Sequence, residues 1–249
     1  MSKPPYRVSE PGKFLNLQPY EVVAVDESGL ISPMGFDGSS YFVVFVCVRA
    51  LYHDTFTMAT KDEYPMVLEL FLNKVKKRGF KVRAMHLRLD NAAEHKGISA
   101  QAVYDKFGIE PGFTIPYYHH QNPAEVAIKE VKKQERVIRK TSSVAVKYWP
   151  LSVLHSGNVL WNILSYPALA KGIPYTIVFD AYFPYKHVRV FGMPCHGAVL
   201  TEQRDVTLLS KSLVDRAKPY IYVGLWSDTC AYKLLDLSDE TLHRCGEPT

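Results

Sequence analysis

Short apolar runs separated by turn residues dominate the first quarter of the chain. The segments 20–26, 39–52 and 53–60 are rich in β-branched and aromatic residues, and they predict three strands in a meander. The segment 39–52 is the longest and carries no helix signals, so we expect it to be a central strand.

Helical and extended patterns then alternate. Between residues 61 and 80, apolar side chains recur at helical spacing, and Gly79 marks the expected end of the helix. The elements expected next are a strand, a short helix, a strand broken by Pro116, and two longer helices, at 81–90, 99–108, 113–118, 122–140 and 147–172. This order predicts an α/β fold in which helices flank a mixed five-stranded sheet.

The pattern changes near the end of the chain. After residue 187 it consists of short strands and turns, at 187–192, 196–200, 219–226, 231–237 and 241–245. These predict a small antiparallel, β-barrel-like domain. We therefore expect three parts: an extended N-terminal arm at 1–18, an α/β core at 19–180 and a β-rich domain at 181–249.

Composition narrows the possible functions only a little. Of 249 residues, 47% are hydrophobic, which is ample for a core, and 30 basic against 25 acidic residues give a net charge of +5. This balance is compatible with nucleic-acid binding without identifying it. No segment predicts a signal peptide or a membrane span. The scattered cysteines argue against a compact zinc site or a disulfide scaffold and favour reduced thiols: Cys47, Cys195, Cys230 and Cys245.

Three acidic residues stand at the ends of predicted elements. Asp26 ends the first strand, Asp90 ends the fourth, and Glu125 opens the helix at 122–140. If the first and fourth strands are parallel neighbours, their ends lie side by side and the helix start can join them. Converging carboxylates without a cationic partner raise one another's pKa, and a divalent cation relieves this repulsion. Mg²⁺ suits such a set, and two ions about 3.5–4 Å apart would clamp a phosphodiester for in-line attack.

Each acid also has a purely local interpretation. Asp26 and Asp90 precede turn sequences, in which such side chains bond to nearby backbone groups. Glu125 lies three residues after Asn122, where it can be part of a helix cap. No single acid decides between these interpretations, but the order of all three along the chain favours a shared site.

The helix that Glu125 opens also carries a basic stripe. At roughly 100° per residue, five cations fall within about 60° of the direction of Glu125, with Lys133 just outside: Lys129, Lys132, Arg136, Arg139 and Lys140. Apolar Ala127, Val131 and Ile138 fall on the opposite side. Such a face can be merely solvated, but beside a metal site it would contact phosphates.

The segment before Glu125, YYHHQN at 117–122, combines aromatic, imidazole and amide side chains. His119 and His120 could ligate zinc, but no further ligands stand at the spacing of a zinc finger. We expect Tyr118, His119 and Gln121 instead to hold DNA near the metal through stacking and hydrogen bonds.

Six short motifs occur in a fixed order between about residues 20 and 245. The first three are VAVDESG around Asp26, GSSYFVVFV in the second strand and RLDNAAEH around Asp90. The others are HHQNPAE ending at Glu125, IPYTIVFDAYFPYKHVRVFGMP and DRAKPYIYVGLWSDTCAYKLLDL. With these motifs the chain resembles the integrase of copia-type (Pseudoviridae-like) LTR retrotransposons, over the catalytic core and the start of the C-terminal region.

The resemblance implies a ribonuclease H-like fold whose D,D,E triad maps onto Asp26, Asp90 and Glu125, the last two being 35 positions apart. Asn91 and Gln121 map onto motif positions beside the metal ions. Family members use Mg²⁺ or Mn²⁺, as two ions, to process element DNA ends and to join the 3′-hydroxyl to target DNA, without a covalent enzyme intermediate. The implied partners are element and target DNA and further copies of the chain, with no membrane and no small-molecule cofactor. The implied location is the nucleus.

The chain also departs from the family pattern. Ala92 and Ala93 replace paired glycines, Pro123 stands for a Gly-Val pair, and Cys47 takes the place of an acid. We also expect the family's N-terminal His-His-Cys-Cys zinc domain to be missing. Two alternatives therefore accompany an active integrase core: a decayed or host-captured relic that only binds nucleic acid, and another ribonuclease H-like transposase or nuclease.

Overall fold

The computed structural model describes residues 16–83, 85–113, 122–142, 144–166, 169, 172–198, 217–226 and 231–246. The predicted arm at 1–18 and the predicted strand at 113–118 lie largely outside these ranges.

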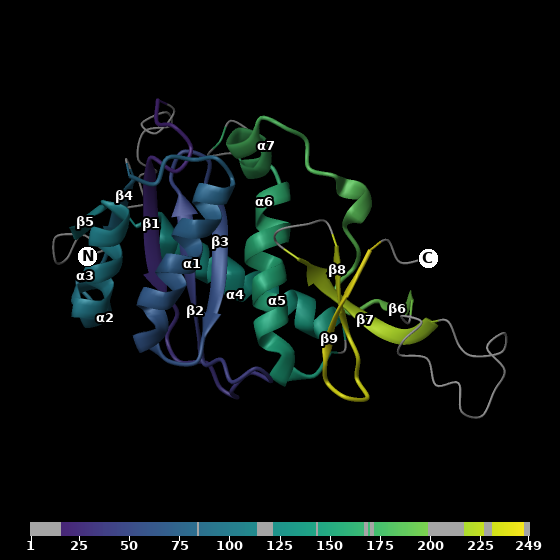
Figure 1. Cartoon of the computed structure of the whole chain (residues 1–249). Helices are drawn as coiled ribbons and strands as arrows, with labels where there is room; N and C mark the ends of the chain where they lie inside the picture. The colour runs from purple at the N-terminus through teal and green to yellow at the C-terminus, as the bar shows by residue number, and fades with distance from the viewer. Residues whose placement is uncertain are drawn as a thin grey trace, which may run out of the picture.

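A five-stranded mixed sheet forms the larger part of the molecule (Figure 1). Its strands are β1 (Val22–Glu27), β2 (Tyr41–Cys47), β3 (Tyr52–Met58), β4 (His86–Leu89) and β5 (Glu110–Phe113). The spatial order is β3-β2-β1-β4-β5. The meander β1-β2-β3 is antiparallel, whereas β4 lies parallel to both β1 and β5. The predicted α/β architecture with a mixed five-stranded sheet is confirmed.

Helices cover both faces of this sheet. One face packs against α1 (Tyr64–Lys77) and α3 (Ile98–Phe107), with a core around Val25, Phe45 and Phe71. The other face carries Ala24 and Val44, and it packs against α4 (Pro123–Ser142) and α5 (Trp149–His155). Strand residues alternate between these two cores because successive side chains of a strand point to opposite faces.

The remaining short elements are η1 (Lys61–Glu63), α2 (Ala93–Lys96), η3 (Val146–Tyr148), the π-helical turn η4 (Ser156–Leu160), α6 (Trp161–Ile163), α7 (Pro174–Phe179) and η6 (Tyr185–His187). The helix predicted at 147–172 was too long, because the backbone becomes extended at Leu164. The strand predicted at 81–90 is limited to β4, and α2 and α7 were not predicted.

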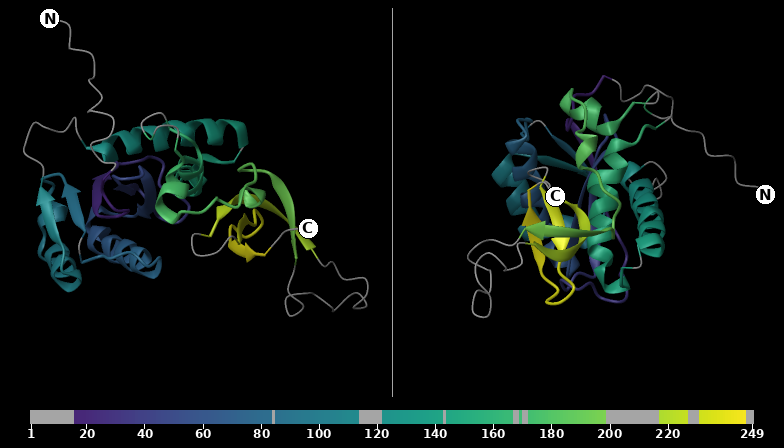
Figure 2. Two further views of the ribbon diagram at one scale, coloured as in Figure 1. Left: turned by 90° about the horizontal axis from the view of Figure 1, so that it is seen from above. Right: turned by 90° about the vertical axis from the view of Figure 1, so that its right-hand side faces the viewer.

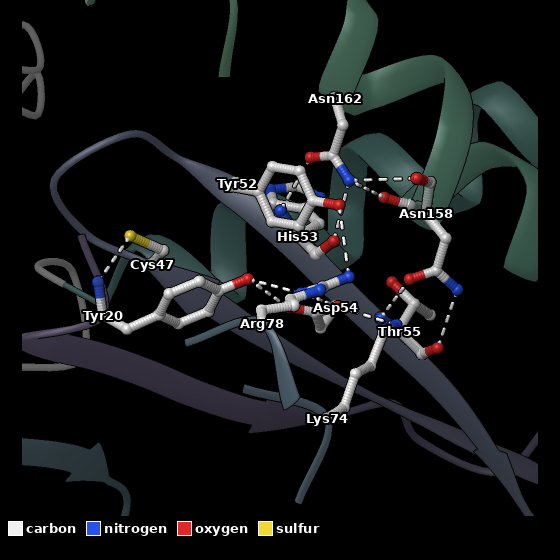
Figure 3. A network of polar contacts seen from close by, with 11 residues as sticks. Tyr20, Cys47, Tyr52, His53, Asp54, Thr55, Lys74, Arg78, Asn158 and Asn162 are labelled. Atoms are coloured by element: carbon white, nitrogen blue, oxygen red, sulfur yellow. Dashed lines mark hydrogen bonds and ion pairs between the residues drawn. The ribbon is translucent and has the colours of Figure 1, made fainter. Parts of the chain in front are cut away.

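Two amide side chains protect the outer edge of β3. Asn158 accepts a hydrogen bond from the backbone N–H of Thr55 and donates to its carbonyl, both at 2.8 Å. Asn162 does the same for His53, also at 2.8 Å (Figure 3). These bonds satisfy backbone groups that a neighbouring strand would otherwise occupy, so the edge cannot readily pair with another chain.

A second sheet follows in the C-terminal part. It consists of β6 (Pro194–Ala198), β7 (Ala217–Leu225), β8 (Tyr232–Leu235) and β9 (Leu242–Cys245), all antiparallel in the order β6-β7-β8-β9. The strand predicted at 187–192 does not form; its first residue belongs to η6. Leu151 of α5 packs with Val223 and Leu235 in one buried cluster, which joins this sheet to the rest of the protein. None of the helices in the described ranges has the length and apolar composition needed to cross a membrane.

Candidate active site

The register of two parallel strands brings Asp26 and Asp90 to the same edge of the sheet. Val22 of β1 pairs with His86 of β4, and Ala24 pairs with Arg88. Asp26 lies two residues beyond Ala24, and Asp90 lies two residues beyond Arg88. The expectation that the first and fourth strands are parallel neighbours is therefore confirmed.

The start of α4 is fixed to the same edge by Asn122. Its side-chain oxygen accepts a hydrogen bond from the N–H of Ala124 at 3.0 Å, which is the cap expected from the sequence. Its side-chain N–H group donates to the carbonyl of Val25 at 3.2 Å. Since Val25 directly precedes Asp26, this contact brings the first turn of α4, and with it Glu125, to the end of β1.

The electrostatics of Asp26 reflect this convergence. The pKa of the Asp26 carboxyl is raised to about 6, mainly by burial. The hydrogen bond from the N–H of Glu27 lowers this pKa, and the negative charges of Asp90 and Glu125 add to the increase. That N–H donates to Asp26 Oδ1 at 2.9 Å. Asp26 therefore holds a proton more tightly than an ordinary aspartate, as expected for a buried acid with other acids nearby.

Asp90 and Glu125 differ from Asp26 in having cationic neighbours. Asp90 Oδ1 accepts a hydrogen bond from Ala92 N at 3.1 Å, so Asp90 is also the turn residue that the local interpretation predicted. The same oxygen lies 2.7 Å from Nδ1 of His95. Glu125 Oε1 accepts from Lys129 Nζ at 2.7 Å. Two of the three carboxylates thus have a cationic partner within the protein.

His95 is the residue of this site that sequence reasoning missed. Its ring is buried between Asp90 and Glu27, whose Oε1 lies 3.3 Å from His95 Nε2. Burial alone would lower the pKa of His95, but the two carboxylates outweigh it and raise the pKa to about 9. The contact with His95 in turn lowers the pKa of Asp90. The sequence gives no signal for this pairing, because it depends on Glu27 facing the other side of the sheet from Asp26.

The three carboxylates approach one another without forming a closed set of ligands. Among the described residues, His, Asp and Glu ligand atoms all within 4.8 Å of one another occur at Asp236, Asp239 and His243. Asp236 and Asp239 lie in the turn between β8 and β9, where Ser238 and Thr241 donate to them, and His243 lies on β9. This group was not among the predicted site residues.

The basic stripe of α4 is only partly solvent-exposed. Lys129, Lys133, Arg136 and Lys140 are exposed, whereas Lys132 is half-buried with its Nζ 5.9 Å from the ring of Phe42. Arg139 Nε donates to Glu135 Oε1 at 2.9 Å, and Glu135 is buried. The helix runs past the first sheet toward the second (Figure 2).

The predicted loop contacts are only partly covered by the structure. Asn91 is exposed in the bend after β4. Tyr118, His119 and Gln121 lie outside the described residues, so their proposed contacts with DNA stay predictions.

A scan of the chain against models of known protein families found no match. The interpretation of the site therefore depends on its own geometry and charge. That geometry comprises three acids at one sheet edge, one of them with a raised pKa, beside the start of a basic helix.

Proposed function

We propose that this protein is a metal-dependent polynucleotidyl transferase with a ribonuclease H-like core, of the retrotransposon integrase type. Asp26, Asp90 and Glu125 are the proposed ligands of Mg²⁺ or Mn²⁺. The observation that carries the proposal is geometric: the register of β1 and β4 places Asp26 and Asp90 at one edge of the sheet, and Asn122 joins the helix start that carries Glu125 to Val25, next to Asp26.

The donor set fits a divalent, oxygen-preferring cation. Asp26 gains no cationic partner among the described residues, and the side chains of Asp90 and Glu125 are each 38% exposed, which leaves room for water and phosphate. Bound there, such an ion would activate a water or a 3′-hydroxyl for attack on a phosphodiester. The order β3-β2-β1-β4-β5, with Asp26 near the end of β1 and Asp90 directly after β4, supports the ribonuclease H-like assignment.

The protein's own residues would orient the nucleic acid. Lys129, Lys133, Arg136 and Lys140 follow Glu125 along the exposed side of α4. A phosphate backbone along this helix would place one phosphodiester beside the three carboxylates, while the other phosphates are held by charge alone. Element-end and target DNA are the proposed substrates, and nuclear action follows from that proposal.

The test is a nicking and strand-transfer assay on labelled duplex ends with Mg²⁺, Mn²⁺ or chelator. We expect metal-dependent product from the wild type and a decrease of roughly 100-fold or more in Asp26→Asn and Asp90→Asn, since a catalytic ion supplies several kcal/mol. Glu130→Gln is the matched control, because Glu130 lies on α4 and pairs with Lys133 at 3.5 Å. Equal product from all four proteins would contradict the proposal.

One observation favours a second candidate, a nucleic-acid-binding module without catalysis. Asp90 and Glu125 already have His95 and Lys129 as cationic partners, and the three acids do not form a closed ligand group. Duplex binding that is insensitive to metal, with no product in Mg²⁺ or Mn²⁺, would support this module. Cleavage of RNA–DNA hybrids without strand transfer would instead indicate a ribonuclease H-like nuclease.

A further inference from the structure

A chain of charged groups lies behind Asp90, on the α1 side of the sheet, and its two middle members, Glu27 and His95, are buried. Glu27 follows Asp26 on β1, so its side chain points to the opposite face, where it is only 3% exposed. His95 of α2 bridges from Glu27 Oε1 to Asp90 Oδ1. Lys61 Nζ lies 3.2 Å from the other Glu27 oxygen and 2.7 Å from Glu94 Oε1.

His95 is fixed in this position by packing as well as by charge. The ring is 1% exposed, and the ring of Tyr64 meets it edge-on with 4.5 Å between centroids. Such a ring cannot rotate away from Asp90 without displacing α1 or breaking the contact with Glu27. The pair of acids and the aromatic neighbour together leave His95 one orientation.

The two carboxylate oxygens of Asp90 differ in their contacts. Among the described residues, both Ala92 N and His95 Nδ1 contact Oδ1, at 3.1 and 2.7 Å. With Oδ1 held from two directions, the carboxylate cannot rotate freely, and Oδ2 is the oxygen available to a cation. Groups behind a metal ligand commonly orient it in this way.

We infer that His95, supported by Glu27, is a positioning residue that holds the Asp90 carboxylate in the orientation needed to bind the divalent cation. This inference rests on the proposed function. His95 touches neither the cation nor the substrate; it acts through Asp90. Its role is to order one ligand before the ion arrives, which lowers the entropic cost of ion binding.

The test is the affinity for Mn²⁺, measured by electron paramagnetic resonance on the whole chain. The variants are Asp90→Asn, His95→Phe and Glu27→Gln, and Tyr64→Phe is the matched control because it keeps the ring against His95. We expect Asp90→Asn to lose the site and His95→Phe to weaken Mn²⁺ binding by about 10–100-fold. Tyr64→Phe should bind like the wild type. Saturating Mn²⁺ should restore the nicking rate of His95→Phe, which a general structural defect would not allow.

The outcomes separate the two proposals. If Asp90→Asn abolishes Mn²⁺ binding while His95→Phe binds as tightly as the wild type or more tightly, the positioning role is overturned and the metal site stands. If the wild type binds no Mn²⁺, or binds it equally after Asp90→Asn, the metal site itself is overturned and the positioning role with it. If a thermal melt shows that His95→Phe does not fold, Glu27→Gln is used for the test instead. We expect Glu27→Gln to bind Mn²⁺ more weakly than the wild type, and unchanged Mn²⁺ binding would contradict the positioning role.

Discussion

Asp26 on β1 and Asp54 on β3 belong to one sheet, but their charges are compensated in different ways. Asp54 is fully buried and receives Lys74 at 2.8 Å, Arg78 at 3.0 Å and the hydroxyl of Tyr20 at 2.7 Å (Figure 3). Burial alone would raise the pKa of Asp54, but these partners outweigh it and hold the pKa well below its usual range. Asp26 receives one backbone N–H and faces two further acids, and its pKa is raised to about 6.

The difference distinguishes a structural acid from one suited to an external cation. The fold surrounds Asp54 with its own cations, Lys74 from the last turn of α1 and Arg78 directly after that helix, so its charge is neutralised internally. No comparable cation reaches Asp26 within the described residues, although Lys61 and His95 lie nearby on the opposite side of β1. A folded protein that leaves such an acid uncompensated loses stability, and a bound divalent cation would restore it.

The largest expected effect comes from breaking the internally compensated site. Asp54→Asn should lower the free energy of unfolding by about 3–5 kcal/mol, because it leaves two partly buried cations without their acid. Urea denaturation at neutral pH measures this. Because the folded-state pKa is lowered, the contribution of Asp54 is fully present above the ordinary aspartate pKa and is lost as pH falls below about 4.

The control for this variant is Asp62→Asn, which changes an exposed acid in η1. Its effect should stay within about 0.5 kcal/mol, as is usual for surface substitutions. A similar small effect for Asp54→Asn would mean that Lys74 and Arg78 are solvated well enough without Asp54. The contrast between the two acids would then disappear.

The sequence predicted the Asp26 site better than the Asp54 site, for a physical reason. Strand ends and helix caps are local patterns, so Asp26, Asp90 and the Asn122 cap could be placed before the register was known. The partners of Asp54, Lys74 and Arg78, come from a helix that crosses the sheet, and periodicity does not report which residues meet across layers. The same holds for His95 against Glu27, and for Asn158 and Asn162 against the edge of β3.

A second prediction sharpens the comparison through pH. Asp26→Asn should raise the free energy of unfolding by roughly 1–3 kcal/mol at pH 7, because the wild type buries a charge there that the variant lacks. A raised pKa means that the folded wild type retains a proton that the unfolded chain releases. Wild-type stability therefore falls as pH rises from about 4 to 6, and the two proteins should be equally stable near pH 4.

Mg²⁺ provides the complementary measurement for Asp26. Thermal unfolding at pH 7 should show stabilisation of the wild type by Mg²⁺, with a much smaller shift for Asp26→Asn. If Asp26→Asn is instead less stable than the wild type at pH 7, Asp26 is compensated within the fold in the way that Asp54 is. Its assignment as a metal ligand would then lose its main support.

The smallest expected effect concerns two adjacent cations of α4, one paired within the fold and one exposed to solvent. Arg139 pairs with buried Glu135, which also accepts from Ser152 at 3.3 Å, whereas Lys140 is exposed at the end of the stripe. Arg139→Gln should lower the free energy of unfolding by about 1–2 kcal/mol, because a buried carboxylate loses its charged partner. Arg139→Gln should leave the salt dependence of duplex binding unchanged.

Lys140→Gln should have the opposite pattern of effects. Its free energy of unfolding should not change, but the slope of log affinity against log salt should decrease by about one, as for the loss of one phosphate contact. Fluorescence anisotropy across a salt series measures the slope. Equal slopes for Lys140→Gln and the wild type would remove this end of the helix from the proposed DNA path, since an exposed cation that releases no counterions contacts no phosphate.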